Sequence, residues 1–169
     1  MRSLRGVGFL RQEILKVLEG DSRLTPAQIA VMLGTTEEAV QKEIERLENE
    51  GVIVGYSTLI DWEKTDRELV TANIAVKVTP QRGHGFDQTA LRIAEFPEVD
   101  AVFLVSGDFD LLVMVEGATI KDIARFVATK LAVMDSVESC TTHFVLKKFK
   151  QNGRIFERQN GDERPNILL

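Results

Sequence analysis

Residues 25–47 constrain the fold more than any other part of this chain, because they predict two short helices joined by a tight turn. Thr25 is a suitable N-cap for the first helix, and Pro26 takes the first helical position, where its missing N–H breaks no hydrogen bond. Gly34 follows the last apolar residue of this helix and can adopt the left-handed conformation that ends a helix. Local signals therefore predict both ends of the first helix.

The second helix is expected to begin at Thr35 or Thr36, and Thr35 has capping-box spacing to Glu38. Its apolar residues recur at intervals of four and three, which places them on one narrow stripe: Val40, Ile44 and Leu47. We expect Gly51 to end this helix. A helix, a glycine-containing turn and a second helix form the pattern of a helix-turn-helix, which places its second helix in a groove of DNA.

Two neighbouring segments favour this interpretation over an unspecialised helical hairpin. Residues 10–18 carry apolar side chains at helical spacing, so a third helix can complete a small core. Residues 51–56 form a short apolar run bounded by glycines, which we interpret as the first strand of a wing. We expect a winged helix-turn-helix domain over residues 1–56, in which residues 1–8 are loosely held.

A second domain begins where the spacing of the apolar residues changes from helical to alternating. The alternation between residues 69 and 78 predicts a half-buried strand. The further elements that we expect are a helix from Phe86 to Pro97, strands at 99–105 and 111–115, a helix at 120–131 and a strand at 141–149. This β-α-β-β-α-β order is the ferredoxin-like arrangement, with one antiparallel sheet and both helices on one face.

The predicted fold class is therefore α+β, with an N-terminal winged helix-turn-helix domain and a C-terminal ferredoxin-like domain. We expect the linker at residues 57–68, the sheet domain at 69–150 and a C-terminal tail at 151–169. Within the tail, Asn152 and Gly153 predict a tight turn followed by a short returning strand. Residues beyond 158 are expected to be disordered.

The predicted sheet has two continuous apolar runs, residues 101–105 and 111–115. Such runs suit strands that are buried on both faces, whereas the two helices of this arrangement cover only one face. Burial of apolar surface stabilises by roughly 25 cal/mol per Å². We therefore expect the other face to pack on the sheet of a second subunit, which makes a homodimer at least.

Composition limits the remaining function classes. The formal net charge is −5, which argues against a mostly basic surface but not against a protein whose basic residues cluster. The single cysteine, Cys140, excludes an internal disulfide framework, and His84 and His143 have neither metal-ligand spacing nor a nucleophile motif beside them. We expect no catalytic site, no metal and no cofactor, and His84 is expected to be solvated. No apolar run approaches membrane-spanning length and no signal peptide is evident, so we expect a cytoplasmic protein without a membrane partner.

Several short motifs in order resemble one family over residues 9–150. They are Ile14-Leu15, Ile29-Ala30 with Leu33-Gly34, Arg46-Leu47-Glu48, Gly107-Asp108-Phe109-Asp110, and Thr142 with Val145-Leu146. Together with the domain order, they resemble the leucine-responsive and asparagine-synthase regulators, the Lrp/AsnC family. The resemblance implies a regulator that binds double-stranded DNA, forms dimers through its sheet domain, and often assembles into tetramers or octamers.

The resemblance also implies a small effector, commonly an amino acid, bound between subunits near the turn after the second strand of the sheet domain. The residues expected to bind it are Ser106, Gly107, Asp108, Phe109, Asp110 and Thr142. A carboxylate in this turn can accept hydrogen bonds from an ammonium group, and glycine permits close backbone approach. The alternative is a turn whose aspartates satisfy backbone donors, with Thr142 as ordinary strand filling.

The predicted reading helix departs from the family in its charge. Between residues 36 and 49 it carries five glutamates against Lys42 and Arg46, and phosphate contacts dominate DNA affinity. The residues expected to contact DNA are Thr25, Gln28, Thr35, Thr36, Gln41, Lys42 and Arg46. Of these, Thr36, Gln41 and Lys42 are the expected base readers, and Arg46 is expected on phosphate.

Two further expectations concern the charges around this helix. Glu43 and Glu48 are expected to pair with neighbours, and Arg11 stands where the family often has an aspartate. Three functions stay open: a ligand-responsive regulator, a sensor or assembly protein whose helix-turn-helix no longer binds DNA, and a small enzyme on a ferredoxin-like scaffold.

Overall fold

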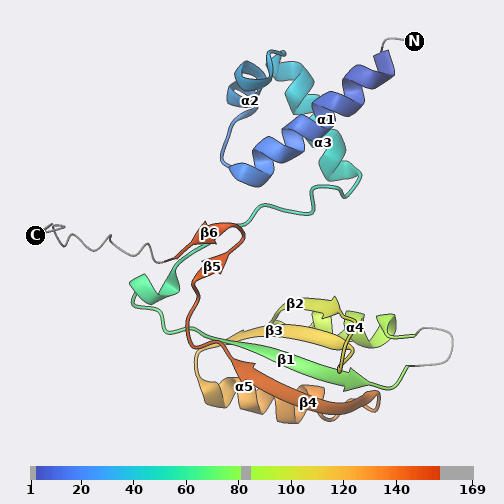
Figure 1. Ribbon diagram of the computed structural model, residues 1–169, viewed down its shortest axis with the longest axis vertical. Helices are drawn as coiled ribbons and strands as arrows, with labels where there is room; N and C mark the ends of the chain where they lie inside the picture. Colours follow the sequence, from blue (N-terminus) through green and yellow to red (C-terminus); the bar gives the residue numbers. More distant parts are fainter. Residues whose placement is uncertain (1–2, 81–84, 157–169) are drawn as a thin grey trace, which may run out of the picture. The chain divides into compact units, whose positions relative to one another are not determined.

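The computed structural model describes residues 3–80 and 85–156, with the side chains of residues 3–7 excepted. It divides into two compact units, Met1–Leu59 and Ile60–Leu169 (Figure 1). His84 and the end of the expected tail, from residue 157 onward, lie outside the described residues.

The first unit contains three helices, α1 (Ser3–Gly20), α2 (Pro26–Leu33) and α3 (Glu37–Asn49). The expected three-helix core is confirmed, and its buried residues come from all three helices: Ile14, Leu18, Ile29, Ala30, Val40, Ile44 and Leu47. The first helix begins at Ser3, so helical backbone extends into the segment 1–8 that we expected to be loosely held. The apolar stripe used to place this helix marks only its packed part, and helical backbone continues beyond it.

The turn between α2 and α3 follows the predicted pattern with one correction. Gly34 has φ +64, the left-handed C-cap conformation, and the Gly34 and Thr35 N–H groups both donate to the Ala30 carbonyl. Thr35 therefore belongs to the end of α2, and the N-cap of α3 is Thr36, whose Oγ1 accepts from the Ala39 N–H at 3.3 Å. The capping box expected between Thr35 and Glu38 is wrong.

The expected wing strand over residues 51–56 is also wrong. Gly51 has φ +70, and the N–H groups of Val52 and Ile53 both donate to the Leu47 carbonyl, so this segment closes α3. Ile53 packs against the three-helix core, whereas Val54 is 94% exposed. Apolar composition alone predicted a strand here, but no neighbouring strand pairs with this segment in the described part of the chain.

The second unit is built on a four-stranded antiparallel sheet in the order β2-β3-β1-β4. Its elements are the 3-10 turn η1 (Trp62–Lys64), β1 (Val70–Val78), α4 (Asp87–Ala94), β2 (Val99–Leu104), β3 (Leu111–Gly117), α5 (Ile120–Phe126), the π-helical turn η2 (Val127–Leu131) and β4 (Val137–Phe144). The ferredoxin-like order is confirmed. Figure 1 shows β1 and β3 at the centre of this sheet.

Both helices of this unit cover the same face of the sheet. Ile93 of α4 and Ile123 and Phe126 of α5 form one core with the inward residues of the central strands: Ala72, Ile74, Val76, Val78, Leu111, Val113 and Val115. On the opposite face, Leu112 and Met114 are half-buried and Phe103 is 49% exposed. The described residues of the chain thus leave this second face without a covering layer.

The largest differences from the expected bounds in this unit occur in two elements, while its other elements differ by up to three residues at their ends. The helix expected over residues 120–131 is α-helical only to Phe126, and the Thr129 hydroxyl donates to the Arg125 carbonyl at 2.8 Å where the helix widens into η2. Strand β4 is Val137–Phe144, four residues earlier than expected at its start. Glu138 and Ser139 are exposed there, whereas Val137 and Cys140 pack against the core, so the start of the strand shows no continuous apolar run.

The expected C-terminal turn is confirmed. Strands β5 (Lys150–Gln151) and β6 (Arg154–Ile155) pair antiparallel across Asn152 and Gly153, which have φ +47 and +75. Positive φ at both central residues is the requirement of a type I′ hairpin turn, which Asn-Gly meets at low cost.

Candidate DNA-binding surface and effector site

Two of the expected DNA contacts, Thr25 and Gln28, form the capping box of α2. The Thr25 N–H donates to Gln28 Oε1 at 2.9 Å, and the Gln28 N–H donates to Thr25 Oγ1 at 3.3 Å. Both residues are exposed. Their oxygen atoms therefore hold the start of α2, which positions the turn in front of α3.

The outer face of α3 presents three of the expected DNA-contacting residues. Thr36, Gln41 and Lys42 are exposed, while Val40, Ile44 and Leu47 turn inward to the core. Gln41 Nε2 donates to Glu45 Oε1 at 2.8 Å, and Thr36 Oγ1 serves as the N-cap. Thr35 is half-buried in the turn.

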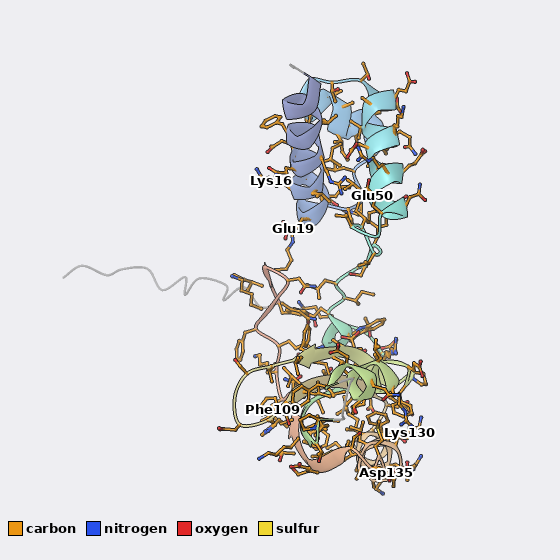
Figure 2. The ribbon with its side chains drawn as sticks, turned by 90° about the vertical axis from the view of Figure 1, so that its right-hand side faces the viewer. Lys16, Glu19, Glu50, Phe109, Lys130 and Asp135 are labelled. Atoms are coloured by element: carbon orange, nitrogen blue, oxygen red, sulfur yellow. The ribbon has the colours of Figure 1, made fainter. Side chains whose placement is uncertain are left out.

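Arg46 lies in a charged cluster that joins α1 to α3. Its Nε donates to Glu50 Oε1 at 2.7 Å, and Arg11 Nη2 lies 2.7 Å from the other Glu50 oxygen. Arg11 Nη1 and Arg46 Nη1 also lie 3.7 Å and 4.0 Å from the two oxygens of Glu43. Glu50, which caps the end of α3 (Figure 2), thus forms ion pairs with both arginines.

The charges of this cluster shift the protonation equilibria of its members. Hydrogen bonds from Arg11 and then Arg46 hold the pKa of Glu50 below its ordinary value, and Glu50 in turn raises the pKa of Arg46. The expectation that Glu43 and Glu48 pair with neighbours is confirmed, since Glu48 accepts from the Tyr56 hydroxyl at 2.8 Å. Burial, and then Glu48, raise the pKa of Tyr56.

Two further cations among residues 8–56 are also engaged by carboxylates. On α1, Lys16 Nζ lies 2.7 Å from Glu13 Oε1. In the segment after α1, Arg23 Nη2 lies 2.9 Å from Asp21 Oδ2. Together with the cluster around Glu50, these pairs leave Lys42 as the cation without a carboxylate partner among residues 8–56. Lys42 is therefore the residue of this surface whose charge is available to a ligand.

The turn between β2 and β3 brings together five of the six expected effector residues. Ser106, Gly107 and Asp108 are exposed, and Phe109 and Asp110 are half-buried. Gly107 has φ +157, a conformation that side chains rarely adopt. Figure 2 shows Phe109 in this turn of the second unit.

The two aspartates of this turn differ in their contacts. Asp110 Oδ2 accepts from the Val78 N–H at 2.9 Å, and the Asp110 N–H donates to the Val76 carbonyl at 3.1 Å. Asp110 therefore fastens the turn to β1 and satisfies a backbone donor. Asp108 is exposed, and no such contact to its side chain is found among the described residues.

Thr142 is not brought to this turn within one chain. Thr142 lies on β4, where it pairs with Ile74 of β1, and β1 separates β4 from β3. Two strand spacings amount to roughly 10 Å, which is beyond hydrogen-bond reach.

Sequence reasoning missed Glu50 and the partner role of Arg11. The spacing of four between Arg46 and Glu50 was a usable signal, because residues i and i+4 are neighbours on a helix. The contact from Arg11 on α1 depends on tertiary packing and gave no local signal.

The part of the chain that the structure describes contains no group of three or more residues arranged to hold a metal ion. It also contains no helix with the length and apolar character needed to cross a bilayer.

Comparison with known proteins agrees with this architecture. The model of the Lrp/AsnC ligand binding domain matches residues 71–155, and the model of a winged helix-turn-helix DNA-binding domain matches residues 10–54. Among solved structures, a Neisseria meningitidis transcriptional regulator in complex with L-Met has a TM-score of 0.68 at 23% identity, covering 84% of this chain and 91% of its own. Escherichia coli AsnC has a TM-score of 0.63 at 19% identity, with 85% and 94% covered. These likenesses show the fold.

Closer relatives are found by sequence. The uncharacterized HTH-type transcriptional regulator YugG of Bacillus subtilis is 50% identical over 153 residues, which cover 90% of this chain and 92% of the relative. The HTH-type transcriptional regulator LrpA of Pyrococcus horikoshii is 31% identical over 137 residues, which cover 81% and 94%. With its DNA-binding unit, its ligand-binding unit and these relatives, the chain belongs to the Lrp/AsnC family of transcriptional regulators.

Proposed function

We propose that this regulator acts in the cytoplasm as a homodimer or larger assembly that binds DNA through α3 and responds to an amino acid. The observation that carries the DNA-binding part is the outward face of α3. There Gln41 and Lys42 are exposed, as is the N-cap Thr36, whereas Val40, Ile44 and Leu47 are buried in the core. This placement is the one that a recognition helix needs to reach base edges in the major groove.

The uncovered face of the sheet supports the dimer. It carries Phe103, Leu112 and Met114, and an exposed apolar surface of this kind is a common site of association. A second copy of the same face would bury these side chains and place two recognition helices in one particle. Two linked helices bind one duplex far more tightly than either alone.

The turn at residues 106–110 is the proposed effector site. The exposed Asp108 carboxylate would accept hydrogen bonds from the ammonium group, and Gly107 would let the ligand approach the backbone. The Neisseria meningitidis regulator solved with L-Met supports an amino acid as the ligand class. Because Thr142 lies two strands from its own turn, we propose that it joins this site from a neighbouring subunit.

A mobility-shift titration tests the proposal. The full chain is titrated onto duplex DNA from upstream of its own gene and onto random duplex DNA of equal length, at two salt concentrations. Saturable binding that is tighter for the upstream DNA and weakens with salt is expected.

One observation favours a second candidate, a sensor or assembly protein whose helix-turn-helix does not bind DNA. The recognition helix is acidic, and its Arg46 is paired with Glu50. Equal and weak binding to both DNA sequences in the titration would support this candidate.

A further inference from the structure

The uncovered face of the four-stranded sheet is apolar over one half and mostly polar over the other. Strands β2 and β3 form the apolar half, with the side chains of Ala101, Phe103, Leu112 and Met114. Strands β1 and β4 form the polar half, with the side chains of Asn73, Lys77, Ser139, Thr141 and His143. These residues alternate along their strands with the residues of the core, so they point to the uncovered side.

Asn73 lies in the middle of this face, on the central strand β1 (Figure 1). Its neighbours in the sheet are Met114 on β3 and His143 on β4. The Asn73 Oδ1 atom is buried, and no described residue donates a hydrogen bond to it. Asparagine is depleted in strands, and buried polar atoms in native proteins are nearly always hydrogen-bonded. A donor for this oxygen is therefore expected from outside the chain that the structure describes.

Two sheets that pack face to face about a two-fold axis can do so in two ways. An axis along the strands places β1 over β3 of the second copy, which sets each polar half on an apolar half. An axis across the strands places β1 over β1 and β3 over β3, so that the apolar halves meet each other and the polar halves meet each other. The second arrangement is favoured, because burying a polar group against an apolar surface costs free energy unless the group is hydrogen-bonded.

The extent of the face indicates where this axis crosses the strands. The outward residues of β1 are Thr71, Asn73, Ala75 and Lys77. An axis level with residue 74 superposes all four on the second copy, which gives the greatest overlap. Asn73 then lies over Ala75 of the partner subunit, whose neighbour on β4 is Thr141 of the partner subunit. A hydroxyl group is thus brought beside the amide that lacks a donor.

The same placement also matches the charges of the two copies. Lys77 is exposed, and it comes over Thr71 of the partner subunit, whose neighbour on β3 is Glu116 of the partner subunit. The two-fold axis repeats this approach of opposite charges at the other end of the interface. Charge complementarity therefore supports the same arrangement as the match of apolar and polar halves.

We propose that Asn73 forms a hydrogen bond with Thr141 of the partner subunit, and that this pair, repeated by symmetry, fixes the orientation of the two sheets. Thr141 is exposed, and its hydroxyl makes no hydrogen bond with another described residue. Rotation of the Asn73 amide about χ2 turns Oδ1 toward the second copy, where the hydroxyl donates to it. This inference rests on the proposed function, because it requires the dimer formed through the sheet.

A buried polar pair of this kind contributes mainly to specificity. Apolar side chains in both positions would pack about as well, but any arrangement that separates the amide from its donor leaves a buried polar group unpaired. A single buried asparagine sets the register of coiled coils by the same physical effect.

The test is a double-mutant cycle on subunit association. T141V removes the hydroxyl and keeps the shape of the side chain, N73L removes the amide, and N73L/T141V removes both. T141S keeps a hydroxyl, and S139A is the control, because it removes a hydroxyl from the next outward position of β4. The dimer dissociation constant of each full-length variant is measured by sedimentation over a dilution series, and thermal unfolding verifies that each variant folds.

T141V should raise the dimer dissociation constant by about a factor of ten, because symmetry repeats the lost bond and leaves two buried amides unpaired. In the N73L background, T141V should change this constant by less than a factor of about two. T141S and S139A should keep the value of the unchanged protein. An equal effect of T141V in both backgrounds would overturn the pair of Asn73 and Thr141 while the dimer stands. An unchanged chain that stays monomeric would overturn the proposed dimer and this inference together.

Discussion

Glu50 accepts a 2.7 Å hydrogen bond from Arg46 Nε, so the guanidinium expected to meet a DNA phosphate already has an anionic partner. Glu50 also pairs with Arg11, which brings α1 into the same cluster. To bind a phosphate, Arg46 must therefore release the Glu50 carboxylate. Breaking this ion pair offsets part of the favourable electrostatic energy of the phosphate contact.

Substitution E50Q is accordingly expected to increase DNA affinity. The neutral amide keeps the size of the side chain but releases the charge of Arg46, which adds about one phosphate contact and steepens the salt slope by about 0.9. Anisotropy titrations at several salt concentrations measure both quantities. E19Q is the matched control, because Glu19, on α1 (Figure 2), is exposed and forms no ion pair with a described residue. An equal effect of the two substitutions would show that only net charge matters.

A fall in pH is expected to lower the folding stability of the second unit, because it protonates the Glu98 carboxylate. Lys130 Nζ lies 2.6 Å from Glu98 Oε1, and this hydrogen bond holds the pKa of Glu98 below its ordinary value of 4.5. A carboxyl whose folded pKa is depressed stabilises the protein above its unfolded pKa, and this stabilisation is lost as the pH falls through the folded pKa.

The thermal midpoint of E98Q should therefore lie below that of the unchanged protein at pH 7, and the two should converge once the pH falls below the lowered pKa of Glu98 in the folded protein. Thermal unfolding followed by circular dichroism between pH 7 and pH 3 measures this difference. A difference that stays constant over the whole range would contradict the assignment to the Glu98 charge.

Substitutions of the two aspartates in the turn between β2 and β3 are expected to differ in effect: one should lower stability and the other should weaken ligand binding. D110A leaves the half-buried Val78 N–H without its acceptor, which should cost about 1–3 kcal/mol of stability. D108A should leave the thermal midpoint nearly unchanged but weaken binding of an amino acid in the proposed effector site. Thermal unfolding and calorimetric titration with L-methionine as the first ligand measure the two effects. Unchanged affinity in D108A would remove Asp108 from the site.

The proposed dimer is expected to depend on Phe103. This side chain is 49% exposed on the sheet face that the helices do not cover, and F103K would place a charge in the proposed interface. Light scattering should show a smaller particle for F103K than for the unchanged protein. L91K is the control, because Leu91 is 68% exposed on α4, on the helical side of the sheet. A smaller particle for both variants, or for neither, would argue against this interface.

Local signals predicted those parts of the fold that depend on nearest neighbours in the sequence. Thr25 and Gly34 fix the ends of α2 through backbone geometry, and Asn152-Gly153 specifies its own turn, so all three predictions are confirmed. The alternation of apolar residues likewise located β1 within one residue of its observed start.

The errors occur where a neighbour distant in the sequence decides the structure. Residues 51–56 have strand-like composition, but no second strand pairs with them in the described chain, and their N–H groups return to Leu47 instead. The start of β4, which contains the exposed Glu138 and Ser139, is a strand because it pairs with β1. At the candidate site, the turn at 106–110 was located from the sequence, whereas the bond from Arg11 to Glu50 depends on how α1 packs against α3.

The attachment of Asp110 has a mechanical consequence. Its side chain accepts from the Val78 N–H and its own N–H donates to the Val76 carbonyl, so two hydrogen bonds join the turn to the last residues of β1. Strand β1 is one of the two central strands of the sheet, and it is the first strand after the connecting segment. A molecule that reorients this turn would therefore also shift the backbone of β1, the strand that is joined directly to the connecting segment.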